Sequence, residues 1–159
     1  MLTQLDEELT RRAIEIARQA RAHGNHPFGS LLADAQGNIL LESENTVNTE
    51  RDATGHAETN LVRMASRKYE RDFLAGCTLY TSTEPCAMCS GAIYWSGINR
   101  VVFALSEAGL LEMTGSDVEN STLALPSREV FARGQRKIEV LGPILVEEAR
   151  AVHAGFWRP

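Results

Sequence analysis

The sequence predicts an α/β fold in which strands alternate with helices along one domain that covers residues 1–159. Two observations lead to this prediction. Several short apolar segments are rich in β-branched and aromatic residues, as strands are. The segments between them repeat their apolar residues with helical spacing. A length of 159 residues suits one compact domain, and the alternation of elements favours a sheet covered by helices.

The first half of the chain predicts a helix, a hairpin and a second helix. Gly24 ends the first helical pattern, and Gly37 marks the turn between two apolar segments. The expected elements, in order, are a helix from Leu5, strands at 28–33 and 39–41, a polar loop over 45–55 and a helix over 57–67.

The second half predicts two further strand and helix pairs around an irregular region. Residues 106–136 are expected to be mostly loop with short helical pieces, because Gly109, Gly115 and Pro126 interrupt the pattern. The other expected elements are a strand at 77–81, a helix from Pro85 to about Trp95, strands at 101–104 and 138–141, and a helix from Pro143 to about His153.

Composition and charge exclude several classes of protein. The formal net charge is −5, which argues against broad nucleic-acid binding, because phosphate contacts need clustered Lys and Arg. No apolar run is long enough to cross a membrane. The segment Met1 to Leu9 is acidic and polar, so no signal peptide is expected. Because no signal peptide is expected and the count of three cysteines is odd, the sequence predicts free thiols and a cytoplasmic location.

Three residues have the chemistry and spacing of a metal site. His56 lies thirty positions before Cys86, and Cys86 and Cys89 share the first turn of an expected helix. Imidazole and thiolate together favour zinc. We find no fourth protein ligand, since Cys77 lies in an expected buried strand. A catalytic zinc site leaves its fourth position to water, so one Zn²⁺ per chain at a catalytic site is predicted.

Glu58 is the predicted catalytic residue. It follows His56 by two positions at the start of an expected helix. A carboxylate beside a metal site that activates water can take a proton from the water and deliver it to the substrate and the leaving ammonia. The combination His-x-Glu with Pro-Cys-x-x-Cys is the signature of zinc nucleobase deaminases.

The chain resembles the cytidine deaminase-like superfamily, and most closely its bacterial guanine deaminases and nucleoside deaminases. The resemblance covers most of residues 5–105, and its motifs are Pro27-Phe28-Gly29, Asn45, His56-Ala57-Glu58, Thr81 to Cys89 and Gly91 to Trp95. It implies a three-layer α/β/α sandwich around a five-stranded mixed sheet, and a homodimer.

The resemblance also implies the residues that contact substrate. Asn45 is expected to hydrogen-bond the purine edge, and the backbone around Ala57 to contact the substrate. Phe28 and Trp95 match aromatic positions near the pocket. The resemblance further implies an acidic residue that hydrogen-bonds the 2-amino group of guanine, and here Asp117 or Glu119 would supply it. The C-terminal segment, about 143–159, is expected to close the pocket, with Phe156-Trp157 as a lid.

The leading interpretation is hydrolytic deamination of a small-molecule purine, guanine to xanthine and ammonia. Guanosine, adenine, cytosine or an aminotriazine such as ammeline are alternative substrates. A tRNA adenosine deaminase is the second hypothesis, because Glu84 to Cys89 resembles that family closely. A non-catalytic zinc-stabilised binding module is the third. It would have no need of an open coordination position beside a carboxylate.

Overall fold

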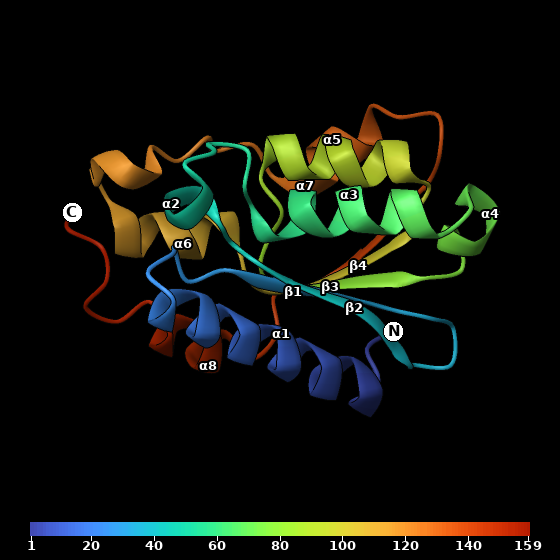
Figure 1. The fold of residues 1–159 in the computed structure, drawn as a ribbon, viewed down its shortest axis with the longest axis horizontal. Coiled ribbons are helices and arrows are strands. Elements are labelled where there is room, and N and C mark those ends of the chain that lie inside the picture. Colours follow the sequence, from blue (N-terminus) through green and yellow to red (C-terminus); the bar gives the residue numbers. More distant parts are fainter.

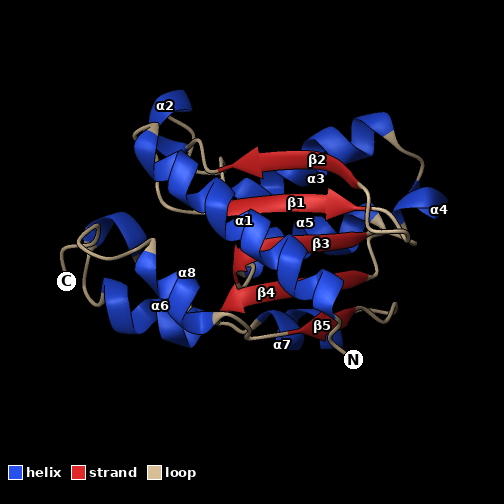
Figure 2. Ribbon diagram, turned by 90° about the horizontal axis from the view of Figure 1, so that it is seen from below, coloured by secondary structure: helices blue, strands red, loops and turns tan.

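The computed structural model describes residues 1–159 as a five-stranded mixed sheet between layers of helices (Figure 1). Across the sheet the strands follow the order β2-β1-β3-β4-β5 (Figure 2). β1 is antiparallel to β2 and β3, whereas β3, β4 and β5 are parallel. The strands are β1 (Gly29–Ala33), β2 (Ile39–Glu44), β3 (Thr78–Thr83), β4 (Arg100–Leu105) and β5 (Glu139–Leu141). The predicted α/β/α sandwich is confirmed.

Helices cover both faces of the sheet. The long helix α1 (Gln4–Ala22) and the short α8 (Val146–Ala151) lie on one face, and α3 (Ala57–Lys68), α5 (Ala87–Ser96) and α7 (Ser127–Ala132) lie on the other (Figure 1). The remaining helical pieces are α2 (Val47–Glu50), α4 (Arg71–Leu74), α6 (Glu107–Thr114) and the 3₁₀ turn η1 (Val118–Asn120).

The core has one apolar layer on each face of the sheet. Successive side chains of a strand point to opposite faces. Leu31 therefore packs with residues of α1 such as Leu9, and Leu32 packs with Leu61 of α3 and Ile93 of α5. Burial on both faces explains the continuous apolar runs that mark the central strands in the sequence.

Gly29 allows β1 to approach α1 closely. A Cβ at this position would lie 2.5 Å from the backbone nitrogen of Ala17 and 2.6 Å from the backbone oxygen of Ala13. Neither backbone atom can move away without shifting the helix. The glycine in the Phe28-Gly29 motif therefore has a packing role.

An ion pair between a buried carboxylate and a half-buried arginine joins α1 to the sheet. Arg100 of β4 donates two hydrogen bonds to the Asp6 carboxylate, at 2.8 and 2.9 Å, and the Tyr80 hydroxyl donates a third at 2.7 Å. Asp6 also completes a capping box with Thr3 at the start of α1. Burial alone would raise the Asp6 pKa, but these hydrogen bonds outweigh it and hold the pKa well below its ordinary value.

We expect Asp6→Ala to lower the free energy of unfolding by about 2–3 kcal/mol, since it leaves Arg100 and Tyr80 without their buried acceptor. Urea unfolding at neutral pH measures the change. Glu42→Ala is the control, because Glu42 makes an ion pair with Arg12 that is exposed to solvent, and such pairs contribute about 0–1 kcal/mol. Equal losses in the two variants would contradict the account.

The segment expected to be mostly loop contains a regular helix. Ser106 caps α6 by accepting a hydrogen bond from the Gly109 backbone N–H. Gly109 lies within the first turn of this helix and against the Leu105 side chain, where a Cβ would come within 2.8 Å. The last helix begins at Val146 and not at Pro143, because Leu145 has a left-handed backbone conformation (φ 51°, ψ 38°). No helix is long and apolar enough to span a membrane.

Candidate active site

Two helix N-termini meet at the candidate metal site. His56 is the residue before the first turn of α3, and Cys86 holds the same position at the start of α5. Both residues have extended backbone geometry, which turns their side chains toward the space between the helices. Cys89 lies one turn into α5 and is completely buried. The predicted spacing therefore brings three donor atoms together from residues thirty positions apart.

The three donors fit a zinc ion. His56 Nδ1 lies 3.5 Å from Cys86 Sγ and 3.6 Å from Cys89 Sγ. Tetrahedral zinc with ordinary Zn–N and Zn–S bonds separates its nitrogen and sulfur ligands by about 3.5 Å. All three donor atoms lie within 4.8 Å of one another, and no other group of His, Cys, Asp or Glu in the chain has this arrangement. The fourth position has no protein ligand, as expected for a catalytic site.

The two sulfurs differ, since the surroundings of Cys86 favour its thiolate, whereas the hydrogen bond to Cys86 and burial raise the pKa of the Cys89 thiol. The pKa of the Cys86 thiol is well below its ordinary value, because Cys89 and His56 hydrogen-bond its thiolate. The same contact raises the His56 pKa. Thr59 Oγ1 lies 3.2 Å from Cys89 Sγ and supplies a further polar neighbour. A cation between these groups would take the place of the shared proton.

Glu58 lies beside the three donors in the first turn of α3. Its side chain is buried, and Thr81 of β3 donates a hydrogen bond to Glu58 Oε1 at 2.6 Å. Burial raises the pKa of Glu58, while the Thr81 hydrogen bond acts in the opposite direction. A carboxylate whose pKa is raised above its ordinary value is a stronger base, which favours taking a proton from water. The proton-transferring role of Glu58 stays a prediction.

A small cavity of about 180 Å³ opens beside Glu58 and the donors. Its lining includes the predicted residues Phe28, Asn45 and Glu119 together with His56, Glu58 and Cys86. Asn45 is buried, and its side-chain oxygen accepts the Val47 backbone N–H. Its NH₂ group is free to donate to a ligand.

The structure does not bring all the expected substrate contacts into this cavity. Trp95 lies at the end of α5 with 74% of its surface exposed, and it does not line the cavity. The Asp117 carboxylate accepts the backbone N–H groups of Glu119 and Arg158, so it caps η1 and holds the C-terminus. Ala57 is fully buried in the first turn of α3.

Sequence reasoning did not find Glu107. This residue begins α6 and lines the cavity, within a segment expected to be mostly loop. Burial, together with negative charge on Cys86 and Glu84, raises the pKa of Glu107 to about 8. The sequence did contain one signal for the start of this helix, because Ser106 is a favourable N-cap residue and the acidic Glu107 follows it directly.

The C-terminal segment packs behind the cavity through aromatic contacts. Trp157 lies against His26 and Phe28, with ring centroids 5.3 and 6.0 Å apart. Its Nε1–H donates to His153 Nδ1 at 3.0 Å. Phe156 also contacts the His26 ring. Because Phe28 and His26 line the cavity, the position of the C-terminal segment after α8 bears directly on the cavity wall.

We expect His153 to make the protein less stable in acid. Burial lowers the pKa of His153 to about 4, and protonation at Nδ1 would displace the Trp157 hydrogen bond. The folded pKa is below the unfolded value of about 6.5, so this stability is present above pH 6.5 and is lost as the pH falls toward 4. The difference between the folded and unfolded pKa values of His153 corresponds to about 3 kcal/mol in the free energy of unfolding. Urea unfolding from pH 7.5 to 4.5 measures it.

His153→Gln should flatten this pH dependence, whereas His23→Gln should not, because the His23 side chain is 59% exposed. A pH dependence that is identical in the wild-type protein and the His153→Gln variant would contradict the assignment.

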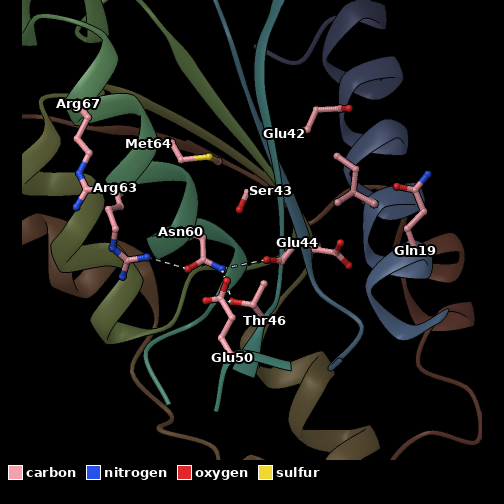
Figure 3. Close-up of a pocket in the computed structure, with 11 residues that line it drawn as sticks. Gln19, Glu42, Ser43, Glu44, Thr46, Glu50, Asn60, Arg63, Met64 and Arg67 are labelled. Carbon is pink, nitrogen blue, oxygen red and sulfur yellow. Dashed lines mark hydrogen bonds between the residues drawn. The ribbon is translucent and has the colours of Figure 1, made fainter. Parts of the chain in front are cut away.

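Another hollow of the surface lies against the free edge of β2 (Figure 3). It measures about 390 Å³ and contains polar groups that already bind one another. Asn60 donates to the Glu44 backbone oxygen and to Thr46, and accepts from Arg63 (Figure 3). It has no cluster of metal ligands, whereas the smaller cavity lies beside the cluster of His56, Cys86 and Cys89.

The fold and the cluster of three metal-ligand side chains beside a buried carboxyl are those expected of a zinc-dependent hydrolytic enzyme. A family model described as the cytidine and deoxycytidylate deaminase zinc-binding region matches residues 3–105. The chain therefore belongs to this family of zinc-binding deaminases.

Relatives of this chain act on different substrates. A probable cytosine deaminase of Schizosaccharomyces pombe is 45% identical over 156 residues, which cover 98% of this chain and 94% of the relative. A tRNA-specific adenosine deaminase of Haemophilus influenzae is 39% identical over 66% of this chain and 61% of its own length. The solved structure of a guanine deaminase from Nitrosomonas europaea has a TM-score of 0.75 and 26% identity, over 96% of this chain and 84% of its own.

Proposed function

We propose that this protein is a zinc-dependent hydrolytic deaminase of a free nucleobase. The observation that carries the proposal is the position of Glu58, a buried carboxyl that shares a small cavity with three zinc-type ligands. A binding module would not need a carboxyl at this place. The resemblance of the donor set to catalytic zinc sites, with an open fourth position, supports the same proposal.

Each residue of the site has a separate role in the proposed reaction. His56, Cys86 and Cys89 would hold the ion, which when bound acts as a Lewis acid and makes water a competent nucleophile near neutral pH. Glu58 takes one proton from the water and gives it to a ring nitrogen, and then takes the remaining proton of the added hydroxyl and gives it to the amine, which leaves as ammonia while the oxygen stays on the ring as a carbonyl. Thr81 orients the Glu58 carboxyl. The Asn45 NH₂ group donates a hydrogen bond to an acceptor on the ring.

Cytosine is the first candidate substrate, and guanine is the second. The S. pombe relative supports cytosine, because its similarity extends over almost the whole of both chains. The cavity of about 180 Å³ is small beside the roughly 300–1,000 Å³ of drug-sized ligand sites, which suits a free base better than a nucleoside. The N. europaea structure and the Tyr94-Trp95 motif support guanine.

Deamination of adenosine in tRNA is supported by the H. influenzae relative. The net charge of −5 and the small cavity favour a small substrate over a tRNA loop. We therefore rank tRNA below the two free bases.

We further propose that the protein is a cytoplasmic homodimer and that residues 143–159 close the cavity. Exposed apolar side chains on α3 and α5, Met64, Met88 and Trp95, support a dimer surface. The contacts of Trp157 with His26 and Phe28 support closure by the C-terminal segment. Free cysteines support a reducing compartment.

The test is ammonia release by the zinc-loaded protein with cytosine, guanine, guanosine, adenine and ammeline, and inosine formation in a tRNA anticodon. We expect kcat/KM for one free base to exceed that for every nucleoside and for tRNA. Turnover of tRNA alone would overturn the choice of a free base. Absence of turnover on every substrate, with one zinc bound per chain, would overturn the proposed activity.

A further inference from the structure

Asn60 of α3 binds both ends of the loop that joins β2 to α3. Its NH₂ group donates to the Glu44 backbone oxygen at 3.1 Å and to Thr46 Oγ1 at 2.9 Å (Figure 3). The Gly55 backbone oxygen accepts from the same group at 3.4 Å. On its other side the amide accepts a hydrogen bond from Arg63. The polar groups in the hollow beside β2 are therefore arranged around one side-chain amide.

The residues bound by this amide flank two groups of the candidate active site. The two at the start of the loop are the neighbours of Asn45 in the chain, and Gly55 directly precedes His56. Asn60 itself lies one helical turn after His56, whose backbone oxygen accepts the Asn60 N–H at 2.9 Å. One side chain therefore connects the segment that carries Asn45 to the helix that starts at a metal ligand.

Gly55 lets the two ends of the loop meet at this amide. The Thr46 N–H donates to the Gly55 backbone oxygen at 2.8 Å. A Cβ on residue 55 would lie 2.8 Å from Thr46 Oγ1 and 3.1 Å from the Asp52 backbone oxygen, so a larger residue would push the ends apart. Because the ends are in contact, the Asn60 amide can hold both of them with one group.

The backbone around Asn45 directs its free NH₂ group. The Asn45 N–H donates to the Phe28 backbone oxygen at 3.1 Å, and its side-chain oxygen accepts the Val47 N–H at 3.1 Å. With one side of the Asn45 amide bound, the place of the NH₂ group in the cavity follows from the place of residues 44–46. Asn60 binds this backbone from the side opposite the cavity and does not line the cavity itself.

We propose that Asn60 is a positioning residue for the deamination, which holds the backbone on both sides of Asn45 against α3 and so fixes the Asn45 NH₂ group relative to the metal site. This inference rests on the proposed function, in which Asn45 donates a hydrogen bond to the base. A donor that is already held in place loses little conformational entropy when the base binds, so its hydrogen bond contributes more to affinity. The effect of Asn60 on the base therefore passes through Asn45.

The test replaces Asn60 by Ala and, in a second variant, by Asp, which keeps the size of the side chain and lacks the NH₂ donor. The control is Arg63→Ala, which removes the contact on the outer side of the amide and leaves the donated hydrogen bonds in place. We expect both Asn60 variants to raise KM for the preferred base about two- to ten-fold, the range that one hydrogen bond contributes, with a smaller change in kcat. Arg63→Ala should keep the wild-type KM, and all three variants should bind one zinc per chain.

A double-mutant cycle with Asn45→Ala separates positioning from a general effect on the structure. Once Asn45 has lost its side chain, adding Asn60→Ala should change KM less than two-fold, because the group that Asn60 positions is gone. Calorimetric titration with cytosine and guanine in the inactive Glu58→Gln background measures the same cycle as Kd.

Equal effects of Asn60→Ala with and without the Asn45 side chain would overturn the positioning role and leave the deaminase proposal intact. An unchanged KM in Asn45→Ala or in both Asn60 variants would do the same. Loss of zinc or of the folded state in both Asn60 variants would also overturn it, since the residue would then support the metal or the fold. Absence of binding and turnover of both bases by the zinc-loaded wild-type protein would overturn the proposed function and this inference together.

Discussion

Replacing Glu58 by Gln is expected to lower kcat by about 10²–10⁴-fold while the metal stays bound, because general acid–base catalysis by a positioned side chain contributes about this factor. Gln has the same size and can still receive the Thr81 hydrogen bond at its carbonyl oxygen. It cannot take or return a proton. Steady-state kinetics on the preferred base, with zinc content measured on the same samples, checks the expectation.

The control for Glu58→Gln is Glu112→Gln, in which an exposed glutamate of α6 is changed in the same way. It should retain wild-type kcat. If Glu58→Gln kept every functional property of the protein with zinc still bound, the site would be a structural zinc site, as in a non-catalytic binding module. That outcome would remove the catalytic role of Glu58.

Replacing Cys86 by Ala should remove both metal and activity. Three protein ligands hold the ion, and loss of one leaves His56 and Cys89 alone. Changes to groups that merely support zinc ligands cost about 10–100-fold in affinity, so loss of a ligand itself should exceed about 100-fold. Metal analysis after gel filtration gives the stoichiometry, and competition with a chromophoric chelator gives the affinity.

Cys77→Ala is the matched cysteine control. Cys77 is buried in the core under α3 and its sulfur is not part of the metal cluster. This variant should bind one zinc per chain and stay active, with only the modest destabilisation of a small cavity. If Cys86→Ala bound zinc as tightly as Cys77→Ala, the assignment of Cys86 as a metal ligand would be wrong.

The sequence was sufficient to predict the metal site because its spacing is local on two helices. His56 and Cys86 each start a helix, and Cys86 and Cys89 share a turn, so the motif contains most of the geometry. The sheet was also predictable, since its central strands are buried on both faces and read as apolar runs. The resemblance implied a five-stranded mixed sheet, but the order of the strands was not predicted, because pairing between distant strands leaves no local mark in the sequence.

The cavity wall could not be predicted in the same way. Glu107 follows from tertiary contacts, since it depends on Glu84 capping a helix that starts twenty-three positions later in the chain. Asp117 has the right charge for reading a substrate, but its carboxylate binds the backbone of Arg158, forty-one positions away. Trp95 lies in a motif that resembles relatives, yet the structure places it at the surface. A pattern gives the residue type, while packing decides which groups are left free to meet a ligand.

The measurement that tests the central claim most directly is turnover of the preferred base by the zinc-loaded protein in water labelled with oxygen-18. A hydrolytic deaminase puts one labelled oxygen into each product molecule and releases one ammonia for each, and a chelator abolishes both until zinc is restored. Product without labelled oxygen, or ammonia release that persists after the metal is removed, would contradict zinc-dependent hydrolysis at His56, Cys86, Cys89 and Glu58.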